Sequence, residues 1–365
     1  MANEATVKFL GAFQRMRKPL QFLTSWFKTD KDSYFNTDSV RIHVRRHGEP
    51  VAVAVQGITS SPRWTDLNQF SKKTFTPYAF NEGYAINGAD VFDMQFGHTE
   101  YDESNYVSLA LKSFAEQGVE KERSILRAIE LMSSQILQTG TVTLINSAGS
   151  TIGAMDFKPK ATHFPQVSVS WATVATATPL DDLEDLADVI RADTGLFPSV
   201  VIMGAGAYRN AIQTTSFLNA LDNRRIETAL IMPESINSSG AKKMGYVDVG
   251  AYRLEIWTYP ATYDHIQTAV KTPYIADDLV VMLSPDTELK MLYGGFPSPL
   301  IGPDPRLAAF TRTMPSRISR AGFVDVNPLI WADETGQVIK GALRSRPLPI
   351  PVGIDEFGCL NTVQP

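Results

Sequence analysis

The chain has 365 residues, 44% of them hydrophobic and 20% charged, which suits one large or two medium folded domains and excludes a compositionally disordered protein. Its net charge of −5 excludes a general affinity for nucleic acid; residues 1–50 are locally basic, and a solvated face is favoured there over a polyanion contact. The single cysteine, Cys359, excludes an internal disulfide and indicates a reducing compartment, and no apolar stretch is long enough to predict a membrane span.

Residues 1–50 have the pattern of an arm rather than of a core. Helical spacing of apolar residues predicts a short amphipathic helix over residues 5–17, which ends before Pro19. An aromatic cluster follows at Phe22, Trp26 and Phe27. Residues 40–44 alternate between apolar and polar, which predicts a half-buried strand.

Residues 51–97 are expected to form an extended ribbon. A β-type run at 51–55 and an aromatic run at 75–80 predict two strands, but a two-stranded ribbon is marginal alone in water and its open edges need covering. The ribbon should therefore bury its apolar face on another chain. Its candidate intersubunit contacts are Trp64, Phe70, Phe75, Pro77, Tyr78 and Phe80.

From residue 98 the pattern becomes helical. One short helix around Phe114 is expected to end at Gly118, and a stronger one is expected over residues 119–138, ended by Gly140. Strands are then predicted at 141–145, 151–157 and 166–172. A Thr/Ala-rich connector at 173–179 indicates a boundary.

After the connector, helices and strands alternate. Helices are predicted at 181–191 and 208–221, strands at 199–203, 254–259 and 279–283, and a Pro/Gly-rich loop at 294–305. Residues 343–352 contain several prolines, which is typical of an edge strand.

The motif search predicts no catalytic, cofactor-binding or metal residue, and hence no cofactor and no enzyme. The best contrary signal is the strand–turn–helix with Gly204 and Gly206, but Arg209 stands where a dinucleotide fold needs a third glycine. A nucleotide-binding α/β enzyme therefore remains an alternative, and a tight turn is favoured. His98, Glu100 and Asp102 lack the spacing of a helical metal site and are interpreted as polar residues at a helix start.

Several short patterns, in order along the chain, resemble the lambda-type major head protein of tailed phages, the capsid protein E family. The matching stretches are Phe22-Leu23 with Trp26-Phe27, Tyr34-Phe35-Asn36-Thr37-Asp38, the 51–55 run after Val40, Phe75-Thr76-Pro77, Leu137-Gln138-Thr139-Gly140-Thr141, Gly153-Ala154-Met155-Asp156-Phe157, Asp181-Asp182-Leu183-Glu184-Asp185-Leu186, 252–259, Pro273-Tyr274-Ile275-Ala276-Asp277 and Tyr293-Gly294. None is specific alone, and their common order carries the resemblance. The chain departs from the family in a shorter, more basic N-terminal arm and a more proline-rich loop at 295–305.

The resemblance implies an α+β protein with the Hong-Kong-97 type capsid fold. Its parts would be an N-terminal arm (1–50), an extended loop (51–97), a peripheral domain (98–174 plus 323–365) with the spine helix at 119–138, and an axial domain (175–322). Tyr293, Gly294 and Phe296 become further candidate intersubunit contacts, in a loop where axial domains would meet.

The resemblance also implies a structural role without catalysis. The chain would be the major capsid protein of a tailed double-stranded DNA phage, assembled from pentamers and hexamers into a procapsid and then a mature icosahedral head. Partners would be further copies of itself, scaffold, portal and a decoration protein, with nonspecific contact to packaged DNA and none to membrane. It would be assembled in the host cytoplasm and located in the virion. A phage-derived shell around another cargo is the remaining alternative.

Overall fold

The computed structural model describes residues 20–35, 39–45, 70–88, 103–146, 148–220, 240–265, 268–296, 317–318, 324–332 and 338–364. The chain divides into two compact units. Unit 1 comprises Met1–Gln21, Ala79–Ala128 and Pro297–Ser345, and unit 2 comprises Phe22–Tyr78, Ile129–Phe296 and Arg346–Pro365. No helix among the described residues is long and apolar enough to cross a membrane.

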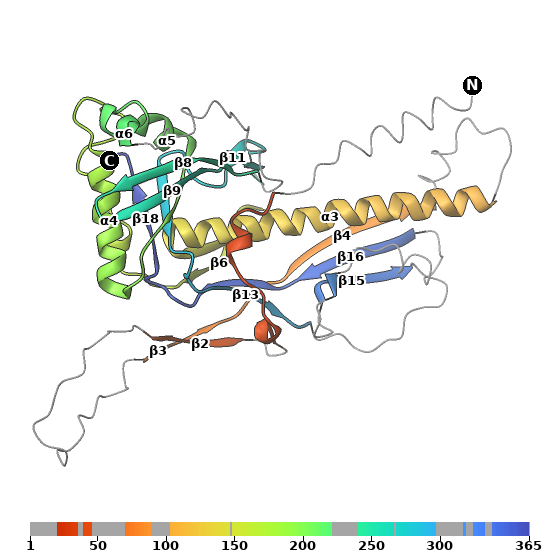
Figure 1. The fold of residues 1–365 in the computed structure, drawn as a ribbon. Coiled ribbons are helices and arrows are strands. Elements are labelled where there is room, and N and C mark those ends of the chain that lie inside the picture. Colours follow the sequence, from red (N-terminus) through yellow and green to blue (C-terminus); the bar gives the residue numbers. More distant parts are fainter. Residues whose placement is uncertain are drawn as a thin grey trace, which may run out of the picture. The chain divides into compact units, whose positions relative to one another are not determined.

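Unit 1 is built on a four-stranded antiparallel sheet in the order β14-β15-β16-β4 (Figure 1). Its strands are β14 (Arg317–Ile318), β15 (Val324–Ala332), β16 (Val338–Ser345) and β4 (Phe80–Asn87). The ring of Tyr84 packs on Phe114 of helix α3 (Glu103–Thr139), with ring centroids 4.8 Å apart. Gly341 lies beneath both rings, and a side chain there would overlap them. Glycine at this position therefore allows the helix to approach the sheet.

Helix α3 is continuous, so the prediction of two helices divided at Gly118 is wrong. A glycine inside a helix costs only about 1 kcal/mol relative to alanine. The apolar stripe continues past it, from Phe114 to Ile125 and Ile129, all buried. The end at Gly140 is as predicted: its φ is 66°, and its N–H donates to the carbonyl of Ile136 at 2.8 Å.

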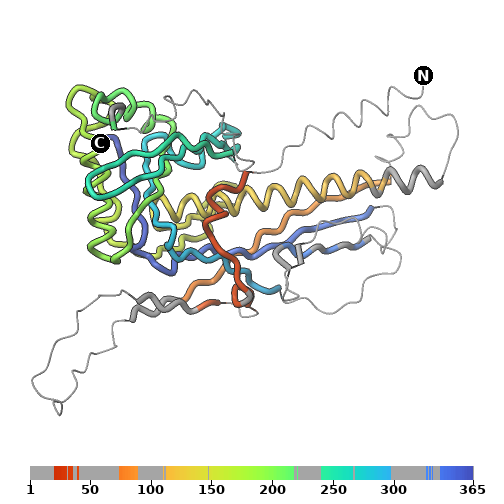
Figure 2. Tube along the Cα trace, in the orientation of Figure 1, coloured from red at the N-terminus to blue at the C-terminus, as the bar shows by residue number. Residues whose placement is uncertain are grey.

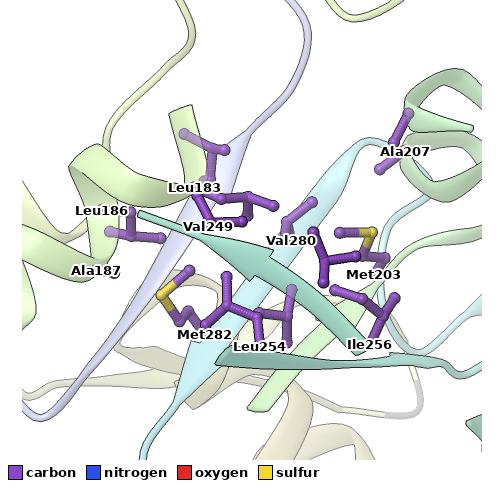
Figure 3. Close-up of a cluster of buried hydrophobic side chains, with 14 of the residues drawn as sticks. Leu183, Leu186, Ala187, Met203, Ala207, Val249, Leu254, Ile256, Val280 and Met282 are labelled. Carbon is purple, nitrogen blue, oxygen red and sulfur yellow. The ribbon is translucent and has the colours of Figure 1, made fainter. Parts of the chain in front are cut away.

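Unit 2 contains a five-stranded sheet in the order β18-β12-β7-β9-β8, in which only the β7–β9 pair is parallel. The strands are β7 (Val200–Met203), β8 (Lys242–Val249), β9 (Tyr252–Thr258), β12 (Leu279–Leu283) and β18 (Phe357–Asn361). Helices α4 (Pro179–Thr194), α5 (Ala205–Ala211) and α6 (Thr215–Ala220) contribute to one buried cluster with alternate side chains of these strands (Figure 3). Alternation along the strands sends the intervening side chains to the opposite face.

Helix α4 confirms the predicted helix at 181–191. Pro179 occupies its first turn, Asp181 and Asp182 lie where the helix dipole favours acids, and Gly195 ends it with a φ of 72°. Its buried face presents Leu183, Leu186, Ala187 and Ile190. Full burial of one leucine side chain contributes roughly 1.5–3 kcal/mol, so this face is sufficient to hold the helix on the sheet.

Smaller sheets complete unit 2. They are β1 (Tyr34–Phe35), β13 (Leu289–Gly294) and β17 (Pro347–Pro351) in the order β1-β13-β17, and the pairs β2 (Val40–Arg45) with β3 (Phe70–Phe75), β5 (Thr141–Ile145) with β6 (Thr151–Asp156) and β10 (Thr262–Asp264) with β11 (Lys271–Pro273). Short 3-10 helices are η1 (Thr24–Trp26), η2 (Lys31–Ser33) and η3 (Ala161–His163). Residues 34–35, 289–294 and 347–351, which are far apart in sequence, thus lie side by side (Figure 2).

One strand prediction and one helix prediction require correction. Residues 166–172 are not a strand: they run beside β18 with one isolated bridge at Gln166, because turns interrupt the ladder. The helix expected at 208–221 is two short helices, since the chain turns at 212–214, where the hydroxyl of Thr214 donates to the carbonyl of Ala211 at 2.7 Å. Strand β18 pairs with β12 in the five-stranded sheet, and the assignment of 323–365 to a peripheral domain stays a prediction.

The ribbon is also arranged differently from the prediction. Strand β3 pairs over six residues with β2, which had been assigned to the arm, and β4 pairs with β16 in the sheet of unit 1. The expected partner run at 51–55 and the expected helix at 5–17 lie outside the described residues.

Candidate assembly surface

The base of the ribbon is held inside unit 2 by aromatic contacts. Phe75, the last residue of β3, is 8% exposed, and its ring lies 4.8 Å from that of Phe157. The hydroxyl of Tyr78 lies so close to Gly153 of β6 that a side chain at Gly153 would overlap it. The ribbon therefore leaves the unit from a fixed base.

Arg346, which immediately precedes β17, connects this base to the end of β13. It is 8% exposed, and its guanidinium donates to the carbonyls of Gly295 (3.0 Å) and Pro77 (3.3 Å). Its own carbonyl accepts the N–H of Gly294 at 2.9 Å. Two candidate contact residues far apart in sequence, Pro77 and Gly294, are therefore brought together by a residue that the sequence motifs did not indicate.

The other candidate contact residues fall into three groups. Tyr293 is half-buried and stacks on Tyr34, with ring centroids 5.6 Å apart. Tyr78, Phe80 and Phe296 are half-buried too. Trp64 and the side chain of Phe70 lie outside the described residues. The contacts found for this set lie within the chain, and a role between subunits stays a prediction.

One free edge of the β1-β13-β17 sheet is closed to another strand. The N–H of Val352 donates to the carbonyl of Glu288 at 2.9 Å, so the even-numbered positions of β17 face β13. Pro347, Pro349 and Pro351 face the other way and have no N–H to offer. This confirms the edge-strand prediction for residues 347–351 and prevents uncontrolled strand addition there, whereas residues 343–345 end β16, which lies between β15 and β4.

The two edges of the five-stranded sheet are protected differently. Along β18, the carbonyl of Asn361 accepts the N–H of Val167 and its N–H donates to Pro165, both at 3.0 Å. On β8 the ladder is irregular between Lys243 and Gly245, and a bulge with a lysine on an edge discourages pairing. Neither edge therefore offers a regular ladder to which a strand of another chain could be added.

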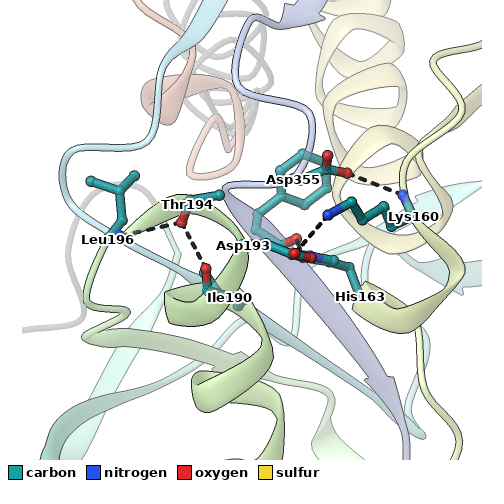
Figure 4. Close-up of polar contacts among 8 residues, drawn as sticks. Lys160, His163, Ile190, Asp193, Thr194, Leu196 and Asp355 are labelled. Carbon is teal, nitrogen blue, oxygen red and sulfur yellow. Dashed lines mark hydrogen bonds and ion pairs between the residues drawn. The ribbon is translucent and has the colours of Figure 1, made fainter. Parts of the chain in front are cut away.

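A buried histidine contacts the C-terminal end of α4 (Figure 4). His163 is fully buried; its Nδ1 lies 3.1 Å from the carbonyl of Phe357 and its Nε2 lies 2.8 Å from Asp193. Lys160 pairs with the other oxygen of Asp193 at 2.6 Å. The hydrogen bond from Lys160, supported by His163, lowers the pKa of Asp193 in spite of partial burial. Because its two ring nitrogens contact Phe357 and Asp193, the side chain of His163 links η3, α4 and β18.

At the glycine turn that suggested nucleotide binding, the backbone of Gly204 packs closely against the backbone of residues 276–277. A side chain at Gly204 would overlap the carbonyls of Ala276 and Asp277. The N–H of Gly204 donates to Leu279 at 2.9 Å, and the N–H of Ala207 donates to Asp277 at 2.7 Å. Two backbone donors of this turn are therefore engaged within the chain, and the favoured interpretation of a tight strand-to-helix turn is confirmed.

Metal ligands were the other chemistry considered. Among the described residues no group of three or more His, Cys, Asp or Glu side chains could hold a metal ion. His98, Glu100 and Asp102 lie outside those residues.

The polar clusters described above make their hydrogen bonds within the fold. A search of curated proteins gives no significant match. The structure is similar to a protein assigned as a prophage capsid protein of E. coli CFT073, with a TM-score of 0.58, 15% identity, and coverage of 95% of this chain and 94% of that one. It is also similar to a phage-related protein of Bordetella bronchiseptica RB50, with a TM-score of 0.50, 10% identity, and coverage of 96% and 94%.

At these identities the similarities show the fold, which is of the Hong-Kong-97 capsid type. The sequence profile of the family described as phage major capsid protein E matches residues 6–357. The chain belongs to this family and is a structural capsid protein of the phage head.

Proposed function

We propose that the chain assembles with copies of itself, as pentamers and hexamers, into the icosahedral shell of a tailed double-stranded DNA phage. The observation that carries this proposal is the family match over residues 6–357. The fixed base of the ribbon supports it, because a ribbon directed by Phe75 and Arg346 can reach a neighbour in a defined direction. The role is structural, and the contact between copies is the activity.

We assign the arm, loop, peripheral and axial parts as the family implies, with two changes that the pairing suggests. The ribbon includes β2, and β18 belongs with the sheet of the axial part. Scaffold, portal and decoration proteins are the proposed partners, together with nonspecific contact to DNA. Assembly takes place in the host cytoplasm, and the product is the virion.

Sedimentation velocity and negative-stain microscopy of the purified chain test the proposal. Closed particles, or pentamers and hexamers, are expected. A small globular species that binds nucleotide saturably would overturn it and restore the enzyme alternative. The contents of isolated particles distinguish a genome-bearing head from a shell around other cargo.

A deletion tests the ribbon itself. Residues 47–68 are replaced by a short glycine–asparagine turn, which leaves the paired strands β2 and β3 intact. We expect a folded subunit that forms no stable shell. Normal assembly of this variant would contradict the role proposed for the ribbon. A variant with Gly83→Ala should assemble normally, because an added Cβ there would make only an ordinary contact with the carbonyl of Gly341 at 3.9 Å.

A further inference from the structure

Helix α3 buries an acidic side chain that accepts hydrogen bonds from two remote segments. Glu130 is fully buried. One carboxylate oxygen accepts the N–H of Leu23 (2.8 Å) and the hydroxyl of Tyr259 (2.9 Å). The other accepts both the N–H (2.9 Å) and the hydroxyl (2.6 Å) of Thr24. These four bonds are called the Glu130 contact below.

The charge of this carboxylate is unusual because no cation balances it. Among the described residues, no Lys, Arg or His side chain forms an ion pair with Glu130. The groups that face it are Thr24, the phenol of Tyr259 and, behind that phenol, the ring of Tyr274 at 6.0 Å. Burial raises the pKa of Glu130, and the bonds from Thr24, Leu23 and Tyr259 oppose this. A buried charge is costly unless it is hydrogen-bonded, so its donors hold it.

The Glu130 contact caps a short helix from a distance. The 3-10 helix η1 has Leu23 at its N-cap position, and no side-chain cap comes from that residue. Its first N–H groups would be unsatisfied if they were buried alone. Glu130 supplies the missing acceptors from 107 residues along the chain. A non-local cap makes the position of this segment depend on one side chain of α3.

Apolar contacts surround the Glu130 contact and complete the attachment. The ring of Phe22 lies 5.5 Å from Trp257 and 5.4 Å from Tyr259. Leu23 and Phe27 are buried. Their burial is nondirectional, so it holds the segment on the surface without selecting one register. The three directional bonds from Leu23 and Thr24 to Glu130 select it.

We propose that Glu130 is the positioning residue that fixes where the N-terminal arm leaves the subunit, by holding Leu23 and Thr24 on helix α3. Loss of the Glu130 contact weakens the attachment of Leu23 and Thr24 to helix α3. The Glu130 contact lies within a single subunit. A role of this contact in shell expansion rests on the proposed function.

The proton dependence of the contact follows from its burial. Because burial raises the pKa of Glu130 above its value in the unfolded chain, its contribution to stability is present below the unfolded-state pKa and is lost as the pH rises through the folded-state pKa. Unfolding of the subunit should therefore become easier with rising pH. Without a carboxyl at position 130, this part of the pH dependence should vanish.

Hydrogen exchange of the full-length chain tests the proposal, with unassembled subunit separated from particles by sedimentation. In Glu130→Gln an amide donor replaces one acceptor oxygen, so the amides of Leu23 and Thr24 should exchange about 10- to 100-fold faster, as loss of one or two buried bonds predicts. Thr24→Val should give about a tenfold effect. The control, Ser134→Ala, removes a buried bond from the same helix to Tyr274 and should leave both amides unchanged.

A second variant separates positioning from general stability. Glu130→Leu removes the buried charge together with the acceptor of four donors, so it should lower the midpoint of urea unfolding and speed exchange at Leu23 and Thr24 more than elsewhere in unit 2. Equal protection of these amides in wild type, E130Q and E130L would overturn the proposal, as would a uniform loss of protection over the whole of unit 2. Failure of the wild type to assemble would leave this result intact and count only against the proposed function.

Discussion

Replacement of Arg346 by methionine tests whether the base of the ribbon depends on its guanidinium. Methionine keeps much of the apolar stem but loses the bonds to Gly295 and Pro77 at 3.0 and 3.3 Å. Each bond from a charged donor contributes about 1.5–3 kcal/mol, and since the two share one side chain they are not additive, so we expect a loss of about 3 kcal/mol. Arg346→Lys retains the charge and one donor direction and should lose about half as much.

Urea unfolding of the subunit measures this loss as a change in midpoint at constant m-value. The control is Arg191→Met, since Arg191 is exposed and pairs with Asp188 on the surface at 2.8 Å, where a pair contributes about 0–1 kcal/mol. If the Arg346 and Arg191 variants lose the same free energy, the reasoning about the base of the ribbon is refuted. Exchange at the amide of Gly294 should rise only in the Arg346 variant.

Other variants test the packing and polar contacts. Gly341→Ala should cost about 1–3 kcal/mol through overlap with the ring of Tyr84, whereas Gly83→Ala should change thermal stability little; equal midpoints would contradict the packing described. Because the pKa of Asp193 is lowered in the folded protein, its contribution is present above the unfolded pKa and is lost as the pH falls through the folded value, so Asp193→Asn should flatten the acid limb of the stability curve. Burial raises the pKa of Cys359 to about 12, so a thiol reagent should label it only after unfolding, and rapid labelling of the folded chain would count against its burial.

Local patterns predicted those elements whose own residues specify them. Helix α4 carries its start signals, its apolar face and its terminal glycine within one short stretch, so its existence could be read from the sequence. The strand Leu279–Leu283 is an uninterrupted apolar run and was predicted with the same bounds. Gly118 misled the prediction, because a local helix penalty of about 1 kcal/mol is outweighed by packing on both sides of it.

The candidate contact residues show the limit of such patterns. Aromatic side chains on the ribbon were predicted to contact another chain. Phe75 packs on Phe157 within the same chain, and a contact between chains stays a prediction for the set. The sequence did hold a signal for Glu130, which lies four residues after Leu126 and seven before Leu137, on a face where both neighbours are buried. An acid on a buried helical face predicts a polar partner, but periodicity does not say which one.

The order of short motifs along the chain was enough to indicate the family and its α+β capsid fold, because each motif depends on residues that are neighbours in sequence. The strand pairing could not be predicted in this way. No local pattern encodes which distant segments pair, and the structure pairs β2 with β3, β4 with β16 and β18 with β12. The contacts of Glu130 and Arg346 are of the same kind. A buried charge is tolerated only where distant donors or acceptors converge on it, and that convergence exists only once the chain has folded.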